Sequence, residues 1–157
     1  GVLSDAGLPC VADPGERVVS LAHSMGYDVE VLPGANAMIL ALAASGLNGE
    51  KFRFCGYVPI DVGECKRKLV EMSQTVKQHN ETQIFMDTPY RNEKLLLNLL
   101  NWLPDAMHLC IAADLLGRDP FVKSCSIAQW KEWAAGKNIK EILACFYFEH
   151  NYGVTFY

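Results

Sequence analysis

Residues 4–15 of this chain read Ser4-Asp5-Ala6-Gly7-Leu8-Pro9-Cys10-Val11-Ala12-Asp13-Pro14-Gly15. Small and turn-forming residues dominate this stretch, which lies between the short apolar segment Val2-Leu3 and a helix start signal. Asp13 can act as the N-cap, Pro14 suits the first helical position, and Glu16 can complete a capping box. Open α/β proteins hold ligands in loops of this kind, near the carboxyl ends of their strands. The stretch therefore predicts a ligand-binding loop, although a plain connector would have a similar composition.

Downstream of this loop, helix-like and strand-like segments alternate without a low-complexity linker or an internal repeat. Asn36 is a good N-cap, and Gly26 and Gly46 stand where helices end. The spacing of apolar residues predicts helices over 14–25, 37–46, 64–78, 92–102 and 127–135, and strands over 29–32, 52–58, 84–86, 109–113 and 142–148. This alternation predicts an α/β fold whose sheet is covered by helices on both faces.

Composition limits the function further. The 157 residues are 50% hydrophobic and 20% charged, which is typical of a globular domain. No apolar run is long enough to span a bilayer, and we expect a cytoplasmic protein. The six cysteines are scattered without a C-x-x-C pair, so we expect reduced thiols and no metal. The net charge of −4 gives no general case for nucleic-acid binding, and a solvated helix face is favoured over an RNA contact for Lys66-Arg67-Lys68.

The loop is the first of several ordered blocks. It is followed by Leu32-Pro33-Gly34-Ala35-Asn36-Ala37, Ala41-Leu42-Ala43-Ala44-Ser45-Gly46-Leu47, Phe52-Arg53-Phe54-Cys55-Gly56-Tyr57-Val58-Pro59 and Ile84-Phe85-Met86-Asp87-Thr88-Pro89-Tyr90-Arg91. Together the blocks resemble the tetrapyrrole methylase superfamily over roughly residues 3 to 135. The nearest branch is that of the small-subunit ribosomal RNA cytidine ribose 2′-O-methyltransferases.

The resemblance implies an architecture and a set of partners. Residues 1–32 would be the end of an N-terminal cofactor domain, and 33–157 a complete C-terminal α/β domain with a mixed sheet. The chain would then be a fragment without the family's N-terminal segment. The cofactor implied is S-adenosylmethionine, with ribosomal RNA as a possible substrate, a homodimer as the assembly, and neither membrane nor metal.

The resemblance also implies site residues. Asn36 stands where the family has a hydroxyl residue, Asp87 where it has glutamate, and Thr88 where it has serine. The cofactor-binding residues implied are Asp5, Ala6, Gly7, Val11, Asn36, Ala37, Asp87, Thr88 and Ala113. The catalytic residue itself is not identified, and the candidates are Asp87, Arg91 and Asp114. For Arg91, a structural role in which it pairs with a carboxylate or caps a turn is an equal alternative. For Asp87 and Asp114, a solvated carboxylate is the more frequent case.

One block departs from the branch. Where the ribose methyltransferases normally show R-E-L-T-K, this chain reads Ala112-Ala113-Asp114-Leu115-Leu116-Gly117-Arg118. Two alternatives therefore stay open beside the ribosomal RNA reaction. One is a methyltransferase of the same superfamily that acts on a tetrapyrrole or another acceptor. The other is a non-catalytic module for cofactor binding or dimerisation.

Overall fold

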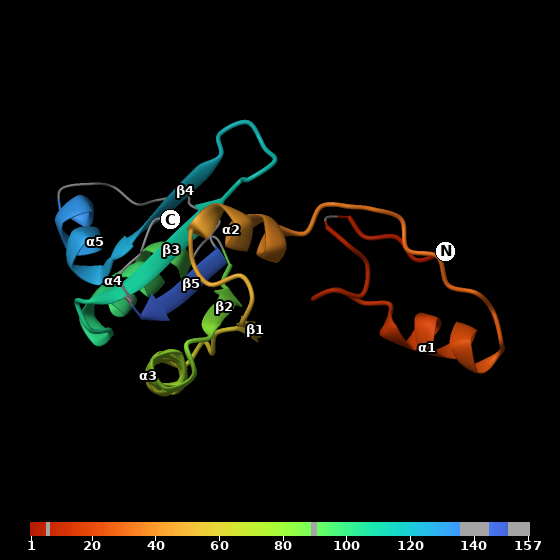
Figure 1. The fold of residues 1–157 in the computed structure, drawn as a ribbon, viewed down its shortest axis with the longest axis horizontal. Helices are drawn as coiled ribbons and strands as arrows, with labels where there is room; N and C mark the ends of the chain where they lie inside the picture. Colours follow the sequence, from red (N-terminus) through yellow and green to blue (C-terminus); the bar gives the residue numbers. More distant parts are fainter. Residues whose placement is uncertain (6, 89–90, 136–144, 151–157) are drawn as a thin grey trace.

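A computed structural model describes residues 1–5, 7–88, 91–135 and 145–150. In chain order the elements are α1 (Glu16–Ser24), α2 (Ala37–Ser45), β1 (Phe52–Tyr57), α3 (Val62–His79), β2 (Thr82–Met86), α4 (Asn92–Trp102), β3 (Met107–Ala113), β4 (Phe121–Ser126), α5 (Ile127–Ala134) and β5 (Cys145–His150). Figure 1 shows that α2 to β5 gather around one sheet, whereas the segment before α2 lies to one side of it.

The sheet is mixed, as the family resemblance implies. Its strand order is β1-β2-β5-β3-β4. β1 and β2 are parallel, whereas β5 is antiparallel to both of its neighbours, β2 and β3. β1, β2 and β3 therefore run in the same direction, and their carboxyl ends lie at one edge of the sheet.

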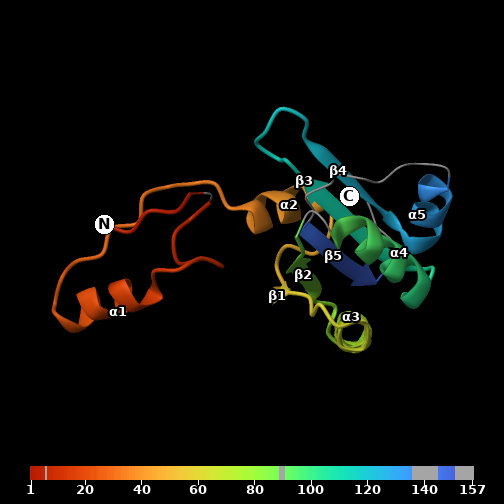
Figure 2. The ribbon, with the colours of Figure 1, turned by 180° about the vertical axis from the view of Figure 1, so that it is seen from behind.

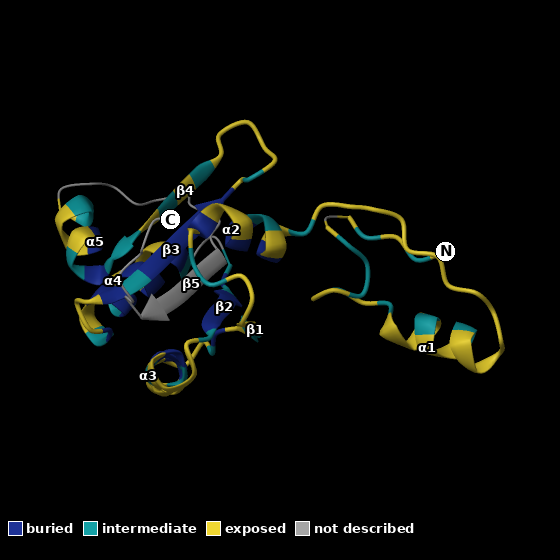
Figure 3. Cartoon of the chain, viewed as in Figure 1, coloured by how far each residue is buried: buried dark blue, intermediate teal, exposed yellow. Residues whose placement is uncertain are grey.

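Helices cover both faces of the sheet, as the alternating pattern predicts. Along β3, Leu109 and Ile111 belong to the larger core, which the sheet forms with α3, α4 and α5. Cys110 and Ala112, which point to the other face, belong to a smaller cluster with α2. This alternation is the period of two that a strand imposes on its side chains. Figure 2 gives the reverse view, and Figure 3 shows buried residues concentrated along β2 and β3 and on the helix faces that contact the sheet.

Side-chain caps fix where several helices begin. Asn36 accepts a hydrogen bond from the backbone N–H of Ile39 at 3.1 Å, which confirms it as the N-cap of α2. Asp61 caps α3 in the same way, with the N–H of Glu64 at 2.9 Å, and so α3 begins two residues earlier than predicted. Ser126 begins α5 with a capping box.

The predicted start of the first helix is wrong. α1 begins at Glu16, and its N-cap is Gly15, so neither Asp13 as the cap nor Pro14 as the first helical residue is correct. The physical reason lies in the preceding loop. Cys10 and Ala12 have left-handed φ angles of 68° and 55°, and these fold the chain back before the helix can start.

Two strand predictions also need correction. Residues 29–32 do not form a strand, because no other strand of the described residues pairs with them. β4, which the sequence analysis did not predict, pairs with β3 from His108↔Ser126 to Ala113↔Phe121. The predicted strand over 142–148 falls partly outside the described residues, and its described part belongs to β5, Cys145–His150.

The segment before α2 exposes much of its apolar surface. α1 contains no buried residue, and Val18, Leu21 and Met25 lie on one side of it at helical spacing, each about three-fifths exposed. Val31 is 79% exposed and Leu32 71%. Figure 3 shows this segment in the colours of exposed and intermediate residues, and none of its described residues in the colour of buried ones. Among the described helices, none is long and apolar enough to cross a bilayer.

Candidate functional site

The predicted site residues of the sheet lie at the edge where β1, β2 and β3 end. Met86 of β2 and Ala112 of β3 both pair with Cys145 of β5. Asp87 and Ala113 are the next residues, so they stand at the same level on either side of β5. Two strand spacings separate them, which is about 10 Å. α2 packs beside this edge (Figure 1). Met86 and Leu115, which lie at the edge, pack against the smaller hydrophobic cluster to which α2 contributes.

The junction between β2 and α4 is a network around Asp87. Asp87 as a whole is 5% exposed. Its carboxylate accepts a hydrogen bond from the backbone N–H of Thr88 at 2.8 Å. Arg91 pairs with the same carboxylate oxygen, Oδ1, at 3.2 Å. The guanidinium of Arg91 also donates to the backbone oxygen of Pro59 at 2.8 Å. Arg91 therefore links the end of β2 to the loop that follows β1 and holds the Asp87 carboxylate in position.

Burial decides the protonation chemistry of Asp87. Loss of solvent raises the pKa of this carboxyl above its ordinary value, although the N–H of Thr88 and the charge of Arg91 both act to lower the pKa. A raised pKa brings a carboxylate closer to the range in which general bases work. Asp87 thus meets one chemical requirement for accepting a proton from a substrate hydroxyl.

Asp87→Asn is expected to remove a pH-dependent part of the stability. Because the folded pKa lies above the unfolded one, the carboxyl favours folding in its protonated form. That contribution is complete below the unfolded pKa and is lost as the pH rises through the folded pKa. We expect the variant to gain stability relative to the wild type between about pH 4 and pH 7.5.

Urea unfolding at both pH values would measure this change. Asp28→Asn, at an exposed position before α2, is the control and should show no such gain. A constant stability difference between Asp87→Asn and the wild type at the two pH values would contradict the prediction.

The loop 4–15 lies against the segment that leads into α2. Gly7 has a φ of 82°, and a Cβ built on it would stand 3.6 Å from the backbone oxygen of Ala35. A Cβ on Gly34 would stand 2.9 Å from Cδ2 of Leu8, so the two segments are in contact there. Two predicted binding segments are thus brought together, and the exposed backbone at Gly7 is open to a ligand.

Asp114 has a structural role in the loop between β3 and β4. Its φ is 47°, and its carboxylate accepts from the N–H of Asp119 at 3.0 Å. Its backbone oxygen accepts from the N–H of Gly117 at 2.8 Å. A side chain at Gly117 would collide with the Asp114 carboxylate, since a Cβ there would lie 1.7 Å from Oδ1. Asp114 therefore holds a tight turn, and a role as catalytic base stays a prediction.

Comparison with known proteins identifies the family. The family model of the tetrapyrrole (corrin/porphyrin) methylases matches residues 1–128. The chain belongs to the tetrapyrrole methylases.

Individual relatives narrow the similarity within the tetrapyrrole methylases. The chain is 34% identical over 140 residues to the ribosomal RNA small subunit methyltransferase I of Halalkalibacterium halodurans, which covers 88% of this chain and 46% of that protein. It is 28% identical over 144 residues to the protein of the same name from Pseudomonas aeruginosa, covering 92% of this chain and 50% of that one. The chain thus spans about half the length of the curated relatives it matches.

Solved structures support the fold of a tetrapyrrole methylase. The methyltransferase CobJ matches with a TM-score of 0.55 at 13% identity, over 92% of this chain and 62% of that one. Uroporphyrin-III C-methyl transferase from Thermus thermophilus, in complex with S-adenyl homocysteine, matches with a TM-score of 0.50 at 17% identity, over 91% and 62% of the two chains. At such identities the likeness extends to the fold alone.

The structure brings some of the predicted site residues together and leaves others apart. Asp87, Thr88 and Arg91 form one network, and Ala113 lies at the same edge of the sheet. Gly7 lies beside the segment that contains Asn36 and Ala37. Asp5 and Val11 are exposed on the loop, and among the described residues no hydrogen bond or ion pair links them to the sheet. Ala6 lies outside the described residues.

Two features near these residues are not predicted from the sequence. One is the backbone oxygen of Pro59, which Arg91 contacts across 32 positions of sequence. The other is Asn92, which is only 3% exposed although it opens α4. Nothing in the local sequence distinguishes Asn92 from an ordinary first helical residue, because its burial comes from tertiary packing.

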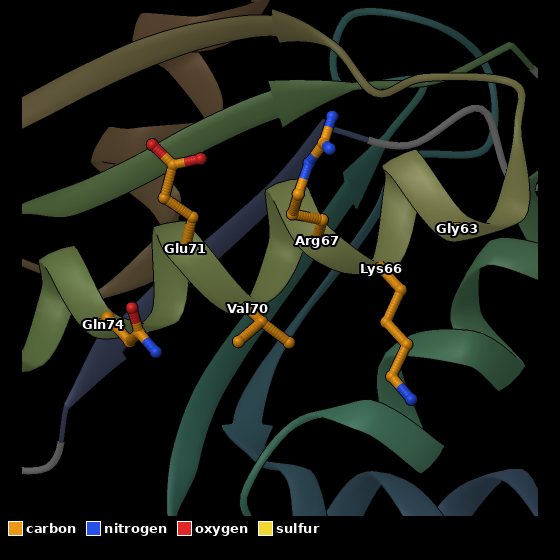
Figure 4. Close-up of a pocket in the computed structure, with 6 residues that line it drawn as sticks. All are labelled: Gly63, Lys66, Arg67, Val70, Glu71 and Gln74. Carbon is orange, nitrogen blue, oxygen red and sulfur yellow. The ribbon is translucent and has the colours of Figure 1, made fainter.

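The basic run on α3 does not form a closed site. A shallow surface hollow there is lined by Gly63, Lys66, Arg67, Val70, Glu71 and Gln74, all from one helix. Figure 4 shows Arg67 and Glu71 projecting to one side of α3 and Lys66 and Gln74 to the other, so these side chains do not converge. The Lys66 ammonium lies 5.9 Å from the ring centre of Trp102. This arrangement agrees with a solvated helix face.

Proposed function

We propose that the protein containing this chain transfers a methyl group from S-adenosylmethionine to a ribose 2′-hydroxyl of small-subunit ribosomal RNA. The observation that carries the proposal is the match, across about nine-tenths of the chain, to relatives named ribosomal RNA small subunit methyltransferase I. When bound, the cofactor supplies an activated methyl group. The protein's part is to bring the two reactants together in the right orientation, which is worth roughly 7–11 kcal/mol of the barrier.

The described residues suit this cofactor. Gly7 exposes its backbone in a loop of small residues, and its left-handed φ suits glycine. At the sheet edge, Asp87 Oδ2 and Thr88 Oγ1 are buried polar atoms that have no hydrogen-bond partner in the part of the chain that the structure describes. Such atoms can receive hydroxyl or amino groups of a ligand. We propose that the cofactor lies between the loop and this edge, held by Asp5, Ala6, Gly7, Val11, Asn36, Ala37, Thr88 and Ala113.

Asp87 and Arg91 have separate proposed roles. Asp87 would accept the proton of the ribose hydroxyl, because burial has already raised its pKa. Arg91 would hold the Asp87 carboxylate in place through its ion pair and its hydrogen bond to Pro59. Arg91 is therefore proposed as a positioning residue.

The domain division is part of the same proposal. Residues 1–32 would complete an N-terminal cofactor domain, and 33–157 would form the C-terminal domain. The support is the exposed apolar side chains of α1 and of Val31 and Leu32, which a folded domain would normally bury. A homodimer in the cytoplasm is the assembly and location that we propose with it.

A second acceptor has one observation in its favour. At the end of β3 and in the loop after it, residues 112–118 do not keep the R-E-L-T-K block of the ribose methyltransferases, and Asp114 holds a turn there. A tetrapyrrole or another small molecule would fit that change better than a charged RNA backbone does.

Titration of S-adenosylmethionine and S-adenosylhomocysteine by calorimetry tests the cofactor. The titration would use this chain and a version extended at its N-terminus by the segment that the family resemblance implies. We expect micromolar binding by the extended version and methyl transfer to small-subunit ribosomal RNA that lacks the mark. Binding without transfer to this RNA would favour the small-molecule acceptor or the non-catalytic module. The absence of binding by either version would overturn the proposed function.

A further inference from the structure

Among the described residues, four buried side-chain polar atoms at the junction of β2 and α4 have no hydrogen-bond partner. They are Oδ2 of Asp87, Oγ1 of Thr88, and both Oδ1 and Nδ2 of Asn92. Asp87 is 5% exposed and Asn92 3%, so bulk solvent reaches neither side chain freely. Folded proteins pair nearly all of their buried polar groups, because leaving one unpaired costs free energy. Their concentration within six residues indicates a place built to receive a polar partner.

The charges of the junction restrict what this partner is. Arg91 is already engaged by Oδ1 of Asp87 and by the backbone oxygen of Pro59. The remaining acceptors are Asp87 Oδ2, Thr88 Oγ1 and Asn92 Oδ1, and the donors are the Asn92 amide and the Thr88 hydroxyl. The free carboxylate oxygen would repel a phosphate or another anion. The atoms suit a neutral group that both donates and accepts hydrogen bonds.

The position of the junction in the fold further restricts which chemical group can bind there. It lies at the carboxyl end of β2, at the same edge of the sheet as Ala113 and next to the loop after β1. This is the edge to which the proposed function assigns the reactants. Both the proposed methyl donor and the proposed acceptor carry a ribose, whose hydroxyls each donate one hydrogen bond and accept others. Two neighbouring hydroxyls match the mixed set of donors and acceptors that Asn92, Thr88 and Asp87 present.

We propose that Asn92, together with Thr88 and Oδ2 of Asp87, binds the hydroxyl groups of a ribose. The inference rests on the proposed function and adds a residue that the family motifs do not mark. The ribose belongs either to the adenosine of the cofactor or to the nucleotide that accepts the methyl group. The two sources share the same chemistry at Asn92, and binding and kinetic measurements distinguish them.

Asn92→Leu tests the proposal, because leucine keeps the approximate shape of asparagine and removes both amide atoms. The variant is made in the N-terminally extended protein. Calorimetry gives its affinity for S-adenosylhomocysteine, and steady-state kinetics give kcat and KM for the unmethylated ribosomal RNA. At least a tenfold loss of affinity for S-adenosylhomocysteine would assign the ribose to the cofactor. At least a tenfold rise in KM for the RNA, with the affinity unchanged, would assign it to the acceptor nucleotide.

Two further variants make the result decisive. Asn101→Leu carries the same substitution at an exposed position of the same helix and should leave both constants within twofold of the wild type. Thr88→Val removes one hydroxyl with little change of shape, and should shift the same constant as Asn92→Leu, by a smaller factor. We also expect Asn92→Leu to unfold at a higher urea concentration, since it removes two unpaired buried atoms.

The outcomes separate this inference from the function on which it rests. If the wild type binds S-adenosylhomocysteine and methylates RNA, but Asn92→Leu leaves both constants within twofold, the ribose site is overturned and the function stands. If Asn92→Leu does not fold, the same comparison is made with Thr88→Val. If the wild type neither binds nor methylates, the proposed function fails and the ribose site fails with it.

Discussion

Trp130→Ala is expected to lower the free energy of unfolding by about 3–5 kcal/mol. Trp130 is 0% exposed and belongs to the larger core between the sheet and the helices α3, α4 and α5. Its indole N–H donates to the backbone oxygen of Leu109 in β3 at 2.7 Å. Alanine would leave a large cavity and remove this link between α5 and the sheet. Urea or guanidinium unfolding would measure the loss.

Trp133 provides a matched control on the same helix. It is only partly buried and meets the edge of the Trp130 ring, with 5.2 Å between the ring centres. We expect Trp133→Ala to lower the free energy of unfolding by about 1–2 kcal/mol, because solvent already reaches this ring. Equal losses at the two positions would contradict the packing described here. If Trp130→Ala instead lost RNA binding while its free energy of unfolding stayed unchanged, the Trp130 ring would serve as a surface for base stacking.

The sequence predicts those elements that local signals define. α2 and α4 have almost the predicted bounds, because an N-cap at Asn36 and runs of leucine at helical spacing are properties of the segment itself. The packing of Trp130 against Trp133 also follows from their spacing of three on one helix. For elements of this kind, the neighbours in sequence are also the neighbours in space.

Elements that depend on distant partners are not predicted. Three of the four residues 29–32 are apolar, and two of these are valine. They nevertheless form no strand, since a strand requires a neighbour to pair with. β4 shows the converse. Its Lys123 and Ser124 obscure the strand pattern, but pairing with β3 makes 121–126 a strand. Strand formation here is decided by the sheet and only weakly by the segment.

The candidate site follows the same division. Asp87 and Ala113 each follow a strand, and because these two strands run in the same direction, both residues lie at one edge of the sheet. That a ligand binds at this edge stays a prediction. The partners of Arg91 and the burial of Asn92 could not be derived, because both depend on packing between segments far apart in sequence. Asp114 was a candidate base from its position alone, whereas the structure shows its carboxylate engaged in a turn.

Gly7→Val is expected to weaken the affinity of the N-terminally extended protein for S-adenosylhomocysteine by well over tenfold. The φ of 82° at Gly7 lies in the left-handed region, where a β-branched residue is strained by at least about 1–2 kcal/mol. Valine would therefore move the loop away from Ala35 or add a side chain where the ligand approaches the backbone. Each result removes contacts that the proposed site needs. Calorimetric titration would measure the loss.

Gly26→Val separates this local effect from general strain. Gly26 has a φ of 76°, close to that of Gly7, but a Cβ there would have no atom within 4 Å. The two variants should therefore suffer similar backbone strain, while only Gly7 stands in the proposed binding loop. We expect Gly26→Val to keep its affinity within about twofold, since a change below about 0.4 kcal/mol is expected for a site that makes no contact. A folded Gly7→Val variant with unchanged affinity would show that the loop 4–15 does not contact the cofactor.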